Sequence, residues 1–229
     1  MNIGHLQRFS LIDYPGKISA IVFTQGCNFR CGYCHNPELV NPRLFSAPVV
    51  HDEVFAFLDK RRGKLDAVVI TGGEPTMHKD LPEFAEAIKD MGYLVKLDTN
   101  GTNPELLGRM ISSGTIDYIA MDIKAPIEKY EEVVNVRMNK EALMVSMNMI
   151  MDSDVDYEFR TTLVQHLFAP GDVIMIAEQI RGARQYVLQR FVPSKHVDAD
   201  FIMAEAFSDE IIEDLRLKIT PLVERLIVR

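Results

Sequence analysis

The 229-residue sequence is poor in cysteine, in long apolar runs and in clustered positive charge, and each shortage excludes a class of protein. Its only cysteines, Cys27, Cys31 and Cys34, are too few and too close together for a disulfide framework. No apolar run is long enough for a membrane span. The formal net charge is −8 and Lys and Arg are scattered, which argues against broad contact with nucleic acid. The first residues lack the basic and apolar regions of a signal peptide, so we expect a cytoplasmic protein.

The length and composition fit one globular domain. Apolar residues make up 47% of the sequence, an ordinary value for a folded chain that buries its own core. No repeat, low-complexity tract or linker divides the chain. We therefore expect one domain over 1–229, with an N-terminal extension at 1–17, which would add a strand or hairpin, and a C-terminal extension at 193–229.

Short apolar runs alternate with amphipathic segments along most of the chain. Strands are predicted at 20–24, 67–71, 94–98, 118–122, 157–162 and 185–189. Helices are predicted at 49–62, 80–91, 104–113, 139–151, 172–182 and 208–227, the last with a kink or break at Pro221. This alternation predicts an α/β fold with a parallel sheet. Six units fall short of the eight in a closed barrel, so we expect a partial (β/α)6 barrel.

Polar motifs follow five successive predicted strands. They are the cysteine loop, the turn at 71–75, the turn at 98–101, the segment 122–124 and the region of Arg160. Because the carboxyl ends of parallel strands meet at one edge of a sheet, we expect these motifs to form one site.

The cysteine loop has the composition of a metal site with an incomplete set of ligands. Thiolates bind iron in iron–sulfur clusters, and a cubane cluster normally takes four of them. Three cysteines without a fourth leave one iron open, which is what a metal needs to bind a substrate. Zinc held by the cysteines and His35 is an alternative, although adjacent Cys34 and His35 would be strained in sharing one ion. Three buried thiols without any metal are a further alternative.

The Cys-x3-Cys-x2-Cys spacing, with the aromatic Tyr33 just before the last cysteine, resembles the signature of the radical S-adenosylmethionine superfamily. The resemblance implies a full or partial (β/α) barrel, a [4Fe–4S] cluster on Cys27, Cys31 and Cys34, and S-adenosylmethionine bound through its amine and carboxylate to the open iron. It also implies reductive cleavage of that molecule to methionine and a 5′-deoxyadenosyl radical. Tyr33 would lie near the adenine.

The turn after the second predicted strand resembles the GGE motif of that superfamily. Gly72 and Gly73 would let the backbone approach the ligand closely, and a carbonyl there would accept a hydrogen bond from the methionyl ammonium. Glu74 would add a carboxylate acceptor. A tight strand-to-helix turn is the purely structural alternative.

The turn after the third predicted strand resembles the Asp-Thr-Asn-Gly of activases of glycyl radical enzymes. Asp98, Thr99 and Asn100 occupy its first three positions. The resemblance implies that Asp98 and Thr99 help to hold a monovalent cation or the polar end of the cofactor. An Asx-type turn without a ligand is the alternative.

Asp122 and Lys124 resemble the Asp-x-Lys of the same activases. Strand alternation points both side chains to one side, where Lys124 would pair with the carboxylate of the cofactor. Arg160 matches an arginine of these enzymes, which implies contact with a carboxylate or with the substrate protein. A structural ion pair with Asp or Glu is the alternative for Arg160.

Segments 10–17 and 34–37 also resemble glycyl-radical-enzyme activases, most closely those of anaerobic ribonucleoside-triphosphate reductase. This implies a glycyl radical enzyme as partner, hydrogen abstraction from one of its backbone glycines, and an electron donor such as flavodoxin or ferredoxin. Two alternatives stay open: a radical enzyme acting on a small molecule, as in deazapurine biosynthesis, and a non-catalytic iron–sulfur sensor or carrier.

Overall fold

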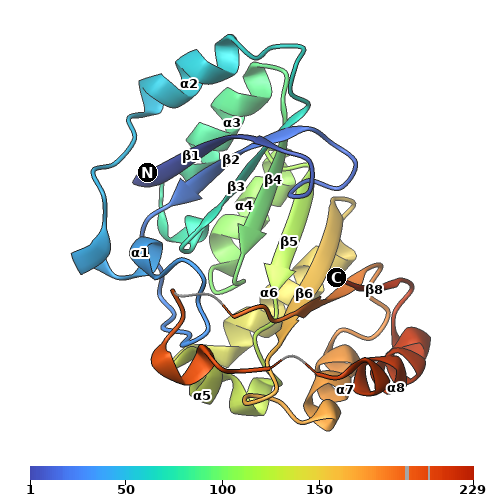
Figure 1. Cartoon of the computed structure of the whole chain (residues 1–229). Helices are drawn as coiled ribbons and strands as arrows, with labels where there is room; N and C mark the ends of the chain where they lie inside the picture. Colours follow the sequence, from blue (N-terminus) through green and yellow to red (C-terminus); the bar gives the residue numbers. More distant parts are fainter. Residues whose placement is uncertain (194–195, 206) are drawn as a thin grey trace.

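All strands among the residues that the structure describes lie in one sheet, in sequence order from β1 to β8 (Figure 1). The computed structural model describes residues 1–193, 196–205 and 207–229. β1 runs antiparallel to β2, and each later neighbour is parallel. No pairing joins β8 back to β1 in the described residues, so the sheet is open. The strands are β1 (Ile3–Ser10), β2 (Ser19–Thr24), β3 (Ala67–Gly72), β4 (Leu94–Thr99), β5 (Tyr118–Asp122), β6 (Asp156–Leu163), β7 (Tyr186–Arg190) and β8 (Leu226–Val228).

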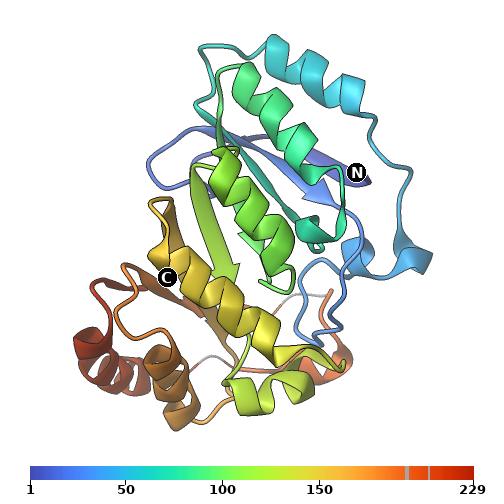
Figure 2. The same ribbon diagram turned by 180° about the vertical axis from the view of Figure 1, so that it is seen from behind.

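Helices cover the convex face of this sheet, as seen from behind (Figure 2). Within the described residues, none of them combines the length and the apolar character needed to cross a membrane. The helices are α1 (Pro37–Val40), α2 (His51–Asp59), α3 (Leu81–Asp90), α4 (Pro104–Ser113), α5 (Tyr130–Val134), α6 (Lys140–Asp152), α7 (Pro170–Gln179) and α8 (Asp209–Ile219).

The predicted α/β fold is confirmed, with two strands beyond the six predicted. These six are β2 to β7, and the N-terminal extension adds β1. The last predicted helix breaks as Pro221 indicates, because α8 ends at Ile219. Residues 226–228 then form β8, which pairs parallel with β7. The short helices α1 and α5 lie in connections that carry no clear helical periodicity.

Period-two alternation gives the strands two different faces. On β4, Val95 and Leu97 join the main apolar core under the helices, whereas Lys96 and Asp98 alternate with them and face the concave side. A small apolar cluster covers that side near the amino ends of β2, β3 and β5. It comprises Tyr14, Ile21, Ala67, Val69 and Tyr118. The concave face therefore changes from apolar to charged toward the carboxyl ends of the strands.

Candidate functional site

A cavity of about 450 Å³ lies at the carboxyl ends of β2 to β7. All thirteen residues predicted from the sequence line it, although they come from segments far apart in the chain. The N-terminal extension adds Asp13 to the wall. The predicted residues brought together are Cys27, Cys31, Tyr33, Cys34, Gly72, Gly73, Glu74, Asp98, Thr99, Asn100, Asp122, Lys124 and Arg160.

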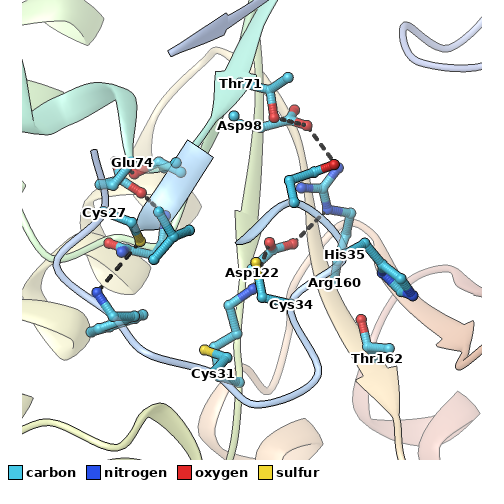
Figure 3. Close-up of a pocket in the computed structure, with 18 of the residues that line it drawn as sticks. Cys27, Cys31, Cys34, His35, Thr71, Glu74, Asp98, Asp122, Arg160 and Thr162 are labelled. Carbon is cyan, nitrogen blue, oxygen red and sulfur yellow. Dashed lines mark hydrogen bonds and ion pairs between the residues drawn. The ribbon is translucent and has the colours of Figure 1, made fainter. Parts of the chain in front are cut away.

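The cysteine loop runs from the end of β2 to α1 and crosses the cavity (Figure 3). All three thiols are free and partly exposed. Neighbouring segments hold the backbone of the loop: Arg30 N–H donates to the Val134 carbonyl at 2.9 Å, and Asp198 N–H donates to the Gly32 carbonyl at 2.9 Å. The loop thus presents its sulfur atoms from a fixed backbone.

Burial and the positive charge of Lys124 shift the pKa values of these thiols in opposite directions. Burial raises the pKa of Cys27 to about 12 and also raises the pKa values of Cys31 and Cys34, while the charge of Lys124 lowers all three. The thiols of the unloaded protein are therefore protonated at neutral pH. Binding of a metal through them must release protons.

The donor set fits an iron–sulfur cluster better than a single ion. In the described part of the chain, no three His, Cys, Asp or Glu side chains converge closely enough to share one metal ion. His35, the fourth ligand of the zinc alternative, is turned toward the C-terminal segment: its Nε2 lies 2.9 Å from the Val192 carbonyl oxygen and its ring stacks on Phe191. Each thiolate of a cluster binds a different iron, so separated sulfurs suit it.

The glycines of the turn after β3 bring two loops into backbone contact. A Cβ on Gly73 would lie 2.0 Å from the carbonyl oxygen of Gly26, the residue before Cys27. Gly73 N–H donates to the Thr24 carbonyl at 2.9 Å, and Glu74 N–H donates to the Gly26 carbonyl at 2.7 Å. The glycines therefore allow a close approach of backbone to the cysteine loop, and the predicted approach to a ligand stays a prediction.

The Glu74 side chain joins this turn to the end of β4. Its Oε1 accepts from Thr76 N–H at 3.0 Å, from the Thr76 hydroxyl at 2.6 Å and from the Thr99 hydroxyl at 2.7 Å. Its Oε2 accepts from Asn100 N–H at 2.6 Å. Burial raises the pKa of Glu74, and these hydrogen bonds oppose the shift. Because Oε2 has one partner among the described residues, it retains room for a hydrogen bond from a ligand.

Glu74→Ala should lower the free energy of unfolding of the unloaded protein by about 3 kcal/mol or more, because it leaves several buried donors without an acceptor. Urea unfolding followed by circular dichroism measures this. Glu86→Ala, at an exposed position of α3, is the matched control and should change the value by less than about 0.5 kcal/mol. A Glu74→Ala protein as stable as this control would contradict the linking role.

Asn100 connects the same turn to the cysteine loop. Its side-chain amide donates to Asn28 Oδ1 at 2.8 Å, and the Asn28 amide donates to the Thr102 hydroxyl at 2.9 Å. Asn100 Oδ1 also accepts from Thr102 N–H at 3.1 Å, which is the Asx turn of the structural alternative. The turn is therefore locally stabilised and also holds the start of the cysteine loop.

Five charged side chains of alternating sign form a chain across β4, β5 and β6. Lys96 Nζ lies 2.7 Å from Asp98 Oδ1, and Asp98 Oδ2 lies 3.1 Å from the Arg160 guanidinium. Arg160 Nε lies 2.7 Å from Asp122 Oδ1, and Asp122 Oδ2 lies 2.9 Å from Lys124 Nζ. Three positive and two negative groups give this network a net charge of +1. It is thus suited to receive one carboxylate.

The members of the network keep each other ionised. Burial alone would raise the pKa of Asp98 and Asp122, but Arg160 together with Lys96 or Lys124 outweighs it and lowers both. Burial would lower the pKa of Lys124, but Asp122 raises it well above its ordinary value. Figure 3 shows Asp98, Asp122 and Arg160 directed toward one another beside the cysteine loop.

Two contributions to the site lie outside the motifs predicted from the sequence. Lys96 is buried beside Asp98, and strand alternation, which places it on the same face, would have indicated it. Phe201, in the predicted C-terminal extension, packs on Tyr33 with ring centroids 6.2 Å apart. A Cβ on Gly32 would lie 2.6 Å from the Phe201 ring, so the two fit closely. No local sequence pattern predicts the contact between Phe201 and Tyr33.

Comparison with known proteins agrees with this geometry. The model of the Radical SAM superfamily matches residues 21–173. A Methanocaldococcus jannaschii protein, provisionally named a glycyl-radical enzyme activating enzyme, is 38% identical over 197 residues, which cover 84% of this chain and 80% of the relative. The pyruvate formate-lyase-activating enzyme of Streptococcus mutans is 28% identical over 82% of this chain and 74% of its own length. A radical SAM methyltransferase from Sphaerobacter thermophilus has the same fold, with a TM-score of 0.74 and 16% identity over 96% of this chain and 68% of its own.

Proposed function

The chain belongs to the Radical SAM superfamily, and from that premise we propose that it activates a glycyl radical enzyme by generating a radical on a backbone glycine. The observation that carries the proposal is the 38% identity, over most of both chains, to a relative provisionally named as such an activating enzyme. Anaerobic ribonucleoside-triphosphate reductase is the proposed partner, supported by the resemblance of segments 10–17 and 34–37 to its activating proteins.

Cys27, Cys31 and Cys34 would hold a [4Fe–4S] cluster with one iron left open for S-adenosylmethionine. When bound, the cluster supplies the electron that cleaves this sulfonium to methionine and a 5′-deoxyadenosyl radical. The three free thiols require a reducing compartment, for which we propose the cytoplasm. Flavodoxin or ferredoxin is the proposed source of the electron.

The residues of the cavity would orient S-adenosylmethionine by its charged end. Lys124 is the proposed partner of its carboxylate, since the ammonium has three donors and Asp122 takes one of them. Glu74 Oε2 and the backbone beside Gly73 are the proposed acceptors for its ammonium. Tyr33, which is 6% exposed, would contribute to the wall beside the adenine and exclude water.

The reaction with the partner is a hydrogen-atom transfer. The Cα–H bond of the target glycine breaks, a C5′–H bond of 5′-deoxyadenosine forms, and the unpaired electron stays on the glycine between its two flanking amides. The partner's glycine loop would enter through the side that the open sheet leaves free.

Electron paramagnetic resonance tests this function. Reduced, reconstituted protein mixed with S-adenosylmethionine and anaerobic ribonucleoside-triphosphate reductase should give a glycyl doublet, and one equivalent of 5′-deoxyadenosine per radical. A reductase with its target glycine replaced by Ala is the control and should give no doublet. A doublet that forms only with a pyruvate formate-lyase would show that this enzyme, and not the reductase, is the partner. A radical product formed only on a small molecule would contradict glycyl activation.

A further inference from the structure

Lys96 is a buried charge in a place where an apolar side chain would be expected. It lies in the middle of β4 between Val95 and Leu97, and it is 2% exposed. Lysine is almost never fully buried unless it is paired, because removing the ammonium from water is costly. Its ammonium contacts Asp98 Oδ1 at 2.7 Å and the face of the Tyr118 ring, whose centroid is 5.9 Å from Nζ. Because the buried ammonium carries this desolvation cost, we look for a role of Lys96 beyond packing.

The electrostatics of the network indicate that role. Without Lys96, two cations and two carboxylates would remain, and the network would be neutral. An incoming ligand carboxylate would then give the network a net charge of −1, which is unfavourable where the effective dielectric constant is low. With Lys96, the same carboxylate brings the network to neutrality. One positive charge next to Asp98 therefore favours binding of the carboxylate.

A monovalent cation beside Asp98 is the other way to supply that charge. Ammonium and potassium ions are similar in size, and both are satisfied by oxygen ligands. The lysine ammonium is a compact point charge whose stem is already held in the strand, so no ion has to be captured from solution. Lys96 thus already occupies one oxygen of Asp98, the residue that the sequence resemblance associates with a cation.

We propose that the Lys96 ammonium replaces a monovalent metal cation at Asp98, so that this enzyme binds S-adenosylmethionine without K⁺ or Na⁺. The lysine is a positioning residue: it balances charge through Asp98 and Arg160 and does not itself contact the cofactor. The inference rests on the cofactor site of the proposed function and is independent of which partner receives the radical.

Cation dependence of cofactor binding tests this role. Affinity for S-adenosylmethionine is measured by calorimetry on anaerobically reconstituted protein, in choline chloride, KCl or NH₄Cl at equal ionic strength. The wild-type affinity should be the same in all three salts. Lys96→Ala should lose about tenfold or more in choline chloride. It should recover most of that loss in KCl and NH₄Cl, because the vacated space admits the ion.

Two further variants separate charge replacement from a structural role. Lys96→Met fills the vacated space without charge, so it should lose affinity in every salt and gain nothing from KCl. Lys89→Ala removes a lysine paired with Asp117, 2.5 Å away and outside the cavity, and should bind as the wild type does in all salts. Thermal unfolding of the unloaded proteins gives a second readout, in which KCl should raise the midpoint of Lys96→Ala selectively.

Wild-type binding that requires K⁺ or Na⁺ would overturn the inference, as would an equal loss by Lys96→Ala in every salt. Wild-type protein that takes up iron but binds no S-adenosylmethionine in any salt would overturn the cofactor site itself, and the inference with it. A failure to form a glycyl radical, in contrast, would count against the partner and leave these binding results in place.

Discussion

Replacement of Cys27, Cys31 or Cys34 by Ala should reduce the cleavage of S-adenosylmethionine by at least about 10³-fold, which corresponds to about 4 kcal/mol of activation free energy. The sequence holds no fourth cysteine that could take over as a ligand. Losing one thiolate leaves two, too few to retain a cubane with a single open iron. The measurement is the yield of 5′-deoxyadenosine and methionine from dithionite-reduced, reconstituted protein.

Folding and ligand loss can be separated in these variants. The three thiols are partly exposed and lie on a loop, so their removal should change the melting temperature of the unloaded protein very little. Iron content after reconstitution should fall together with cleavage. Normal turnover by any one of the three variants would show that its cysteine is not a ligand.

Gly73→Ala should reduce cleavage by about 10²-fold although it changes no proposed ligand. The new Cβ would lie 2.0 Å from the Gly26 carbonyl oxygen and 2.6 Å from its carbonyl carbon. Backbone cannot rotate away as a flexible side chain can, so the peptide before Cys27 has to shift. Overpacking of this kind costs about 1–3 kcal/mol of stability. Cleavage rate and urea unfolding together measure both effects.

Gly171→Ala is the matched control for this substitution. Gly171 lies in the first turn of α7, and no heavy atom would meet a Cβ there within 4 Å. Its replacement should leave cleavage unchanged and should stabilise the protein by up to about 1 kcal/mol, because Ala favours a helix. Equal activity of the Gly73→Ala and Gly171→Ala proteins would contradict the close backbone contact.

The parallel part of the fold can be predicted because its strands are buried on both faces. Runs such as 67–71 and 118–122 are apolar enough to mark β3 and β5 nearly to the residue. β8 was not predicted, because residues 226–228 gain their strand only by pairing with β7, an interaction remote in sequence. The break at Pro221, in contrast, has a local cause in the missing N–H of proline.

The site can be predicted as far as local motifs reach. The carboxyl ends of parallel strands converge, so the residues after them were expected to meet, and they line one cavity. What each carboxylate pairs with could not be predicted, because Arg160 reaches Asp98 and Asp122 across neighbouring strands. The contact of Phe201 with Tyr33 depends on tertiary packing alone. Strand alternation predicts the face on which Lys96 lies, but its partner follows only from the structure.

Iron content and the spectrum of the reduced protein test the central claim most directly, namely that the cysteine cavity holds a cluster with an iron open to S-adenosylmethionine. Anaerobic reconstitution should give about four iron per chain, and the electron paramagnetic resonance signal of the reduced cluster should change when S-adenosylmethionine is added. Binding of one zinc per chain without uptake of iron, or a cluster signal that S-adenosylmethionine leaves unchanged, would contradict it.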